Sequence, residues 1–116
     1  MTDLHPASLA KLVRSISMLA LPFAAQVEWL RSLGLGEPEF ADELALELED
    51  GARLAMQFQD AGWLKPEARQ LILELDAALA ARSGPDHEDF WRMASLRDAP
   101  EWDDVRGLAT QVLLAL

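Results

Sequence analysis

Apolar residues recur at helical spacing in several separate segments of this chain. Residues 7–20 place leucine, valine and isoleucine three and four positions apart, which predicts a first amphipathic helix. Leu21-Pro22 interrupts the pattern, because proline disfavours helical geometry in the residue before it. Pro22 can in turn begin a second helix, which we expect to end at Gly34 as a left-handed cap.

The longest run of helical apolar spacing lies between Glu37 and Leu64, and we expect one long helix from Pro38 to Ala61. Residues 43–49 also alternate polar and apolar, as a strand does, but the chain has no second strand-like run to pair with them. We expect this helix to bend or to be interrupted near Asp50-Gly51. Its apolar positions share one broad face: Phe40, Leu44, Ala45, Leu48, Ala52, Ala55 and Phe58.

A further helix is expected from Pro66 to Arg82, with proline at its first position and Ser83-Gly84-Pro85 ending it. Asp86 is a candidate N-cap for a short helical piece over residues 87–93.

The last helix is expected to begin at Pro100, and we expect its apolar end at Leu114 and Leu116 to be docked on the core. The whole pattern predicts an all-α, single-domain irregular bundle over residues 1–116. It would contain about five helices plus a short helical segment.

Composition limits the class of protein. The chain has 116 residues, of which 51% are apolar, so it can bury a core without help from disulfides or bound metal. The absence of cysteine excludes disulfides and thiolate metal sites. The N-terminal segment lacks the basic and apolar regions of a signal peptide. No apolar run approaches the roughly 20 residues of a membrane span. We therefore expect a cytoplasmic protein that does not contact membranes.

Charge is distributed unevenly. Residues 1–36 carry three basic side chains against two carboxylates, whereas the remaining residues carry eighteen carboxylates against seven basic side chains, for a total of −10. Such a field repels nucleic acid and attracts basic partners. The alternative interpretation is that the acidic surface serves solubility alone.

No catalytic motif is present. The chain has no cysteine or tyrosine, no GxSxG serine and no glycine-rich phosphate loop. His87-Glu88-Asp89 is the one cluster that could suggest a metal, but its spacing fits no common metal motif and capping of a helical turn explains it. We predict a protein that is not an enzyme and that has no cofactor or metal.

Four tryptophans supply half of the aromatic residues. Trp29 and Trp102 lie on or beside apolar stripes and are expected in the core. Trp63 and Trp91 lie in connections beside carboxylates, where an aromatic anchor with an acidic rim suits a basic partner. The other interpretation is that these two side chains cover the ends of the bundle.

Three segments carry a resemblance to a known class: ADELALELEDGARLAMQFQDAGWL, LDAALAARSGP and LRDAPEWDDVRGLA, which together span residues 41–109. They resemble small acidic helical proteins of high-GC bacteria that accompany toxin-immunity and other accessory loci. This resemblance implies a helical fold and a bacterial cytosol. Immunity proteins as a class are small, single-domain, acidic when the toxin is a basic nuclease, and free of catalytic motifs.

The function predicted from the sequence is that of an immunity- or antitoxin-like inhibitor that binds a basic partner protein, for which a toxin is one candidate. The alternative is a helical structural or regulatory module that forms a homo-oligomer or joins a larger assembly, motivated by Leu46 and the apolar C-terminus. The candidate partner-binding residues are acidic or aromatic: Asp42, Glu43, Glu47, Asp50, Asp60, Trp63, Asp86, Glu88, Asp89 and Trp91.

Overall fold

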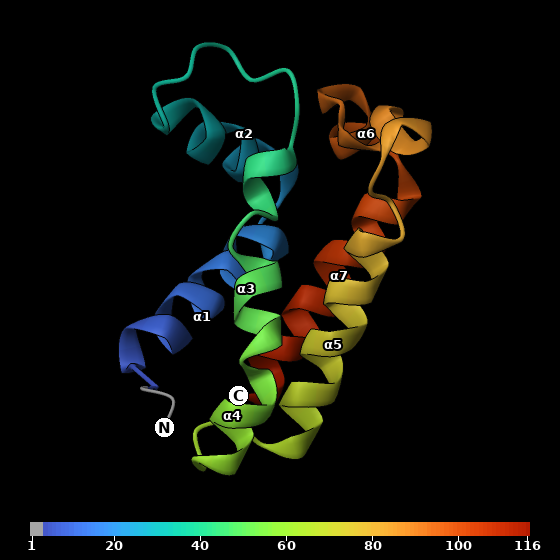
Figure 1. Ribbon diagram of the computed structural model, residues 1–116. Coiled ribbons are helices and arrows are strands. Elements are labelled where there is room, and N and C mark those ends of the chain that lie inside the picture. The colour runs from blue at the N-terminus through green and yellow to red at the C-terminus, as the bar shows by residue number, and fades with distance from the viewer. Residues whose placement is uncertain (1–3) are drawn as a thin grey trace.

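Seven α-helices and two 3₁₀ segments make up the computed structural model, which describes residues 4–116 (Figure 1). The all-α prediction is therefore confirmed, with more and shorter elements than expected. In chain order the elements are α1 (Pro6–Ala20), α2 (Phe23–Ser32), η1 (Asp42–Leu44), α3 (Leu48–Arg53), α4 (Ala55–Asp60), α5 (Pro66–Ala80), η2 (Pro85–Trp91), α6 (Met93–Asp98) and α7 (Pro100–Ala115).

Helix boundaries set by proline and glycine lie close to where the sequence predicts them. Pro66 and Pro100 occupy the first turns of α5 and α7, and Pro22 lies one position before the first residue of α2. Gly34 follows α2 with a φ of 73°, which is the predicted left-handed cap. α5 ends at Ala80, two residues before the predicted end at Arg82.

The prediction of one long helix from Pro38 to Ala61 is wrong. The chain forms only η1, a turn at residues 45–47, and then the short helices α3 and α4. Tertiary pairing prevents a helix at the start of this segment, since the Ala41 N–H donates to the Trp91 carbonyl at 2.7 Å. The pairing includes an isolated antiparallel bridge between Phe40 and Arg92. Non-local backbone bonds of this kind override local helix propensity.

The expected interruption does occur, but the break between α3 and α4 falls at Leu54 and not at Asp50-Gly51. Gly51 lies inside α3, where its role is to leave space for a neighbouring helix and not to bend the chain. A Cβ atom at this position would lie 2.6 Å from Cδ1 and 2.8 Å from Cβ of Leu12 on α1. Glycine therefore permits the close approach of α1 and α3.

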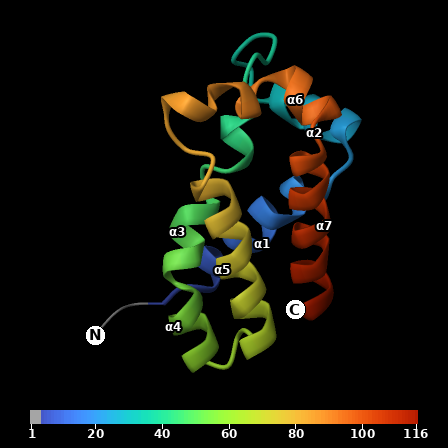
Figure 2. The same ribbon diagram turned by 90° about the vertical axis from the view of Figure 1, so that its right-hand side faces the viewer.

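The core is formed by α1, α5 and α7 together with the α3–α4 segment (Figure 2). The expected apolar face of residues 40–58 does point inward, since Leu44, Leu48, Ala52, Ala55 and Phe58 are buried, whereas Phe40 and Ala45 are only partly buried. Trp102 is fully buried and Trp29 partly, as expected.

The C-terminus departs from expectation. Leu114 is 82% exposed and Leu116 is 44% exposed, so the prediction that both are docked on the core is wrong. Their neighbours Leu113 and Ala115 do pack against the core. The apolar stripe of α7 is narrower at this end than the sequence implies, and its outer leucines face solvent.

Residues 85–98 form two elements, in contrast to the single helical piece over 87–93 that the sequence predicts. Gly84 has a φ of 101° and turns the chain into η2, so Asp86 lies within the first turn and is not its N-cap. Arg92 then adopts an extended conformation because it pairs with Phe40, and α6 begins after it.

A buried polar cluster joins α2 to α7 near the end of α1. Gln26 is fully buried, and its amide nitrogen donates to the carbonyls of Met18 and Leu19, each at 3.2 Å. Its amide oxygen accepts from Nε and Nη2 of Arg106 at 3.1 and 2.9 Å. Arg106 also donates to the carbonyl of Leu96 on α6. We call this cluster the Gln26–Arg106 clasp.

Candidate partner-binding cleft

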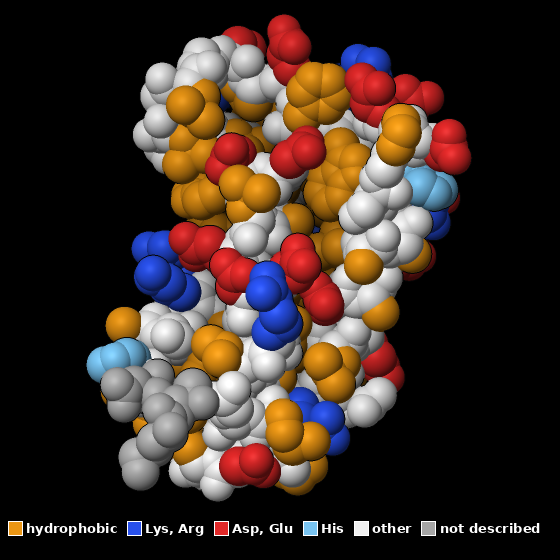
Figure 3. All heavy atoms as spheres, viewed as in Figure 1, with side chains coloured by type: hydrophobic (Ala, Val, Ile, Leu, Met, Phe, Trp, Pro, Cys, Tyr) orange, Lys and Arg blue, Asp and Glu red, His pale blue; other side chains and the backbone are white. Residues whose placement is uncertain are grey.

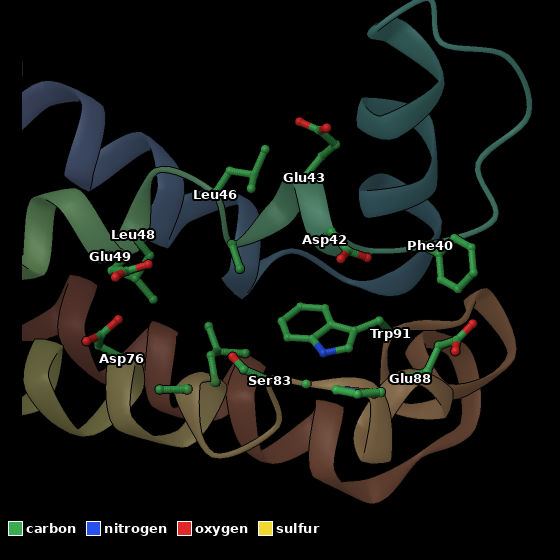
Figure 4. Close-up of a pocket in the computed structure, with 15 residues that line it drawn as sticks. Phe40, Asp42, Glu43, Leu46, Leu48, Glu49, Asp76, Ser83, Glu88 and Trp91 are labelled. Atoms are coloured by element: carbon green, nitrogen blue, oxygen red, sulfur yellow. The ribbon is translucent and has the colours of Figure 1, made fainter.

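A cleft of about 960 Å³ opens between two walls of the molecule (Figures 3 and 4). One wall is η1 with the start of α3, and the other is the end of α5 with η2. The backbone pairing of Phe40 with Arg92 joins the two walls at one end. Figure 4 shows the indole of Trp91 lying between the walls.

The floor of the cleft is apolar, and its central side chain is held firmly. Trp91 donates from Nε1 to the carbonyl of Arg82 at 2.8 Å. It packs edge-on against Phe90 and Trp102, with ring centroids 5.0 and 5.6 Å away. Trp102 is itself fixed, since its Nε1 donates to the Phe90 carbonyl at 2.7 Å. The apolar lining comprises Phe40, Ala45, Leu46, Leu48, Leu79, Ala80, Pro85 and Trp91.

The charged side chains that line this cleft are all carboxylates, with no lysine, arginine or histidine among the lining residues. Two of them have basic neighbours outside the lining: Glu88 lies 3.2 Å from Arg92, and Glu49 lies 3.8 Å from Arg53. Figure 3 shows acidic side chains on both sides of the hollow. The five lining carboxylates are Asp42, Glu43, Glu49, Asp76 and Glu88.

Asp76 on α5 and Glu49 on α3 approach each other from opposite walls (Figure 4). Partial burial raises the pKa of Asp76, and repulsion by Glu49 raises it further, whereas Arg53 acts in the opposite direction. The Glu49 carboxylate therefore adds a smaller, electrostatic contribution to the effect of burial at Asp76, and Arg53 partly offsets it.

The raised pKa of Asp76 gives a pH-dependent prediction for Asp76→Asn. Below the ordinary aspartate pKa of 3.8 the folded and unfolded states are both protonated at this residue. As pH rises through the higher folded-state pKa, wild type loses stability that the asparagine variant keeps. Urea unfolding should show the variant gaining stability over wild type between pH 4 and pH 7. Asp104→Asn, an exposed carboxylate outside the cleft lining, is the control, and an equal gain there would contradict the cause given.

Of the candidate residues predicted from the sequence, the cleft brings together Asp42, Glu43, Glu88 and Trp91. Glu47 lies outside this lining, where it pairs with Arg14 at 3.2 Å. The remaining candidates also lie outside it: Asp50, Asp60, Trp63, Asp86 and Asp89.

Three of these outlying candidates have contacts of their own. Asp50 pairs with Arg53 at 2.6 Å, and Asp89 with Arg92 at 3.1 Å. Trp63 is 37% exposed and stacks on the buried ring of Phe58 at a centroid distance of 6.0 Å. Trp63 therefore covers the end of the bundle where α4 turns into α5.

Glu49 and Asp76 belong to the cleft but were not among the predicted partner-binding residues. A usable signal exists for Asp76, which follows the buried Leu75 and stands three positions before the buried Leu79. A carboxylate at the border of a buried apolar stripe lies beside the neighbouring element. Glu49 carries no such local signal, because α3 was expected to be part of a longer helix.

Comparison of the chain with protein-family models, curated proteins and solved structures finds no significant match. Over residues 4–116, none of the helices is both long enough and apolar enough to cross a membrane. Within the same range no group of three or more histidines and carboxylates is arranged to hold a metal ion.

Proposed function

We propose that this protein is a non-catalytic binding protein that neutralises a basic partner protein, in the manner of an immunity protein or antitoxin. The observation that carries the proposal is the cleft lining, in which five carboxylates and no basic side chain surround an apolar floor. The formal charge of −10 over the whole chain adds a long-range field of the same sign.

The two parts of the lining support different steps of binding. Carboxylates at the rim accelerate encounter with a positively charged protein and orient it. A rigid aromatic floor lengthens the life of the complex, because tryptophan supplies a large contact area and is enriched among residues that dominate binding energy. Trp91 is already fixed by its hydrogen bond to Arg82, so little side-chain entropy is lost when a partner covers it.

Self-association is the second candidate function, and the exposed apolar end of α7 favours it. Leu114 is 82% exposed, and Leu46, at 59%, is a further exposed leucine on the cleft wall. The acidic lining disfavours the cleft itself as the contact between two copies of a chain with a net charge of −10. Light scattering at tens of micromolar tests this candidate, and a monomer would remove it.

The proposal predicts that affinity capture from the native host at low salt recovers a basic protein and that a salt step releases it. Raising salt from about 0.05 to about 0.5 M should slow association far more than it speeds dissociation, because screening acts mainly on long-range steering. Mass spectrometry identifies the captured protein, and surface plasmon resonance gives the two rates.

Two results would contradict the proposal. One is capture of no protein other than the chain itself, which would favour the self-associating module. The other is a captured partner whose association rate does not change with salt, which would mean that the acidic surface takes no part in recognition.

A further inference from the structure

We propose that the segment of the partner that enters the cleft is a basic amphipathic helix. This inference rests on the proposed function and specifies the chemistry of the occupant: an apolar stripe flanked on both sides by arginine or lysine. Three features of the cleft support it, namely the structure of its walls, its open shape and the placement of its charges.

The walls of the cleft are formed by helical elements and offer no strand long enough for strand addition. They are built from η1 and α3 on one side and α5 and η2 on the other. The extended pairing at one end is a single bridge between Phe40 and Arg92, in which the Ala41 N–H donates to the Trp91 carbonyl and the Met93 N–H to the Glu39 carbonyl. One bridge is too short an edge for an added strand, whereas a helix seated in a groove between helices is a common mode of peptide recognition.

The shape of the cleft favours a helix face over a small molecule. Sites for small ligands enclose most of the ligand surface. This hollow, of about 960 Å³, is open to solvent along the face shown in Figure 3, so it would leave much of a small ligand exposed. An open groove of this size can take one stripe of a helix and leave the opposite face in water.

Charge is placed on both walls with the apolar floor between them. Asp42, Glu43 and Glu49 come from the η1–α3 wall, while Asp76 and Glu88 come from the α5–η2 wall. A helix that lays leucine-like side chains on Trp91 would carry its flanking positions toward these two rows. Basic residues at the flanks of the helix would pair with the carboxylates of both walls. One of them would lie near Glu49 and Asp76, beside Arg53.

The same features decide against the other occupants. Nucleic acid is repelled by the carboxylates. A second copy of this chain would bring its own net charge of −10 to an acidic groove. Residues 1–36 are the one predominantly basic part of the chain, and their net charge of only +1 is too small to attract the acidic cleft of a second copy.

The test uses a hydrocarbon-stapled helical peptide of about 15 residues, a length at which an unstapled helix is marginal in water. Its leucines form one stripe and its arginines flank that stripe. A second peptide has the same composition with the leucines scattered around the helix, and a third has glutamate in place of arginine. Calorimetry gives the affinities, and the indole N–H resonance of Trp91 reports contact with the floor.

The matched protein variants remove two carboxylates each. Glu49→Gln/Asp76→Asn changes the cleft, whereas Glu67→Gln/Asp104→Asn changes exposed carboxylates outside its lining. We expect the first peptide to bind wild type and the control variant equally and to shift the Trp91 resonance. The cleft variant should bind it about tenfold more weakly or worse, as expected for loss of close charge pairs, and the other two peptides should bind weakly or not at all.

Each contrary outcome has a definite meaning. Equal binding of the striped and scattered peptides, or equal loss in both variants, would overturn the helix inference and indicate attraction by net charge alone. Failure of every peptide to bind, while a basic protein is still captured from the host, would overturn the inference and leave the proposed function standing. Failure of the peptides together with an empty host capture would overturn both.

Discussion

Replacing Arg106 by methionine is expected to lower the free energy of unfolding by about 3 kcal/mol, which is the scale for breaking a buried charged contact. The Arg106 side chain is only 13% exposed, and it supplies the hydrogen-bond donors for the amide oxygen of Gln26. Methionine fills similar space but donates nothing, so the fully buried Gln26 is left with an unpaired oxygen. Thermal and urea unfolding followed by circular dichroism measure the loss.

Arg97→Met on α6 is the matched control, because Arg97 is 60% exposed and, within residues 4–116, pairs only with the neighbouring Asp98. Its expected effect is within about 0.5 kcal/mol. The double variant Gln26→Leu/Arg106→Met should lose less free energy of unfolding than the sum of the two single variants. Each single change leaves hydrogen-bonding groups of the other residue unpaired, and the double change removes both sets. Additive losses, or an Arg106 variant as stable as the control, would show that the clasp contributes little.

Gly51→Ala is expected to destabilise the protein by about 2 kcal/mol, although alanine favours helix over glycine by about 1 kcal/mol. The added methyl group would lie 2.8 Å from Cβ of Leu12, an atom that no rotation of the Leu12 side chain can move. α1 and α3 would therefore have to separate. The measurement is urea unfolding, compared with the same change at a helical glycine that has free space.

Gly107 on α7 provides that comparison, because a Cβ atom there would have no atom within 4 Å. Gly107→Ala should stabilise the protein by about 0.5–1 kcal/mol through helix propensity alone. Opposite signs at the two glycines are the expected result. Stabilisation by both changes would mean that α1 and α3 do not approach as closely as the structure shows.

The parts of the fold that could be predicted from the sequence are those fixed by local chemistry. Prolines mark the starts of α5 and α7, and the left-handed Gly34 marks the end of α2, although Pro38 begins no helix. Periodicity also predicts the buried positions of α7 from Trp102 to Val112, but not the exposure of Leu114. Gly51 shows where such reasoning stops, since its helical propensity predicts a bend, whereas its role is set by Leu12, which lies far away in the sequence.

The candidate site could be predicted only in part for the same reason. Asp42 and Trp91 share the cleft because residues 39–41 pair with residues 91–93, and no local sequence pattern predicts that pairing. The same pairing prevents the helix expected over residues 38–61. The approach of Glu49 to Asp76 depends on how α3 packs against α5. Acidic character was visible in the sequence, but the particular carboxylates that share a cleft were not.

We propose that the cleft, and not the acidic surface in general, captures the basic partner. The most direct test is a side-by-side capture from the native host with wild type, the Glu49→Gln/Asp76→Asn variant and the Glu67→Gln/Asp104→Asn variant, all with the fold checked by circular dichroism. We expect wild type and the second variant to recover the same basic protein in equal amounts, and the cleft variant to recover about a tenth or less. Equal recovery by both variants would show that the carboxylates of the cleft have no special part in capture.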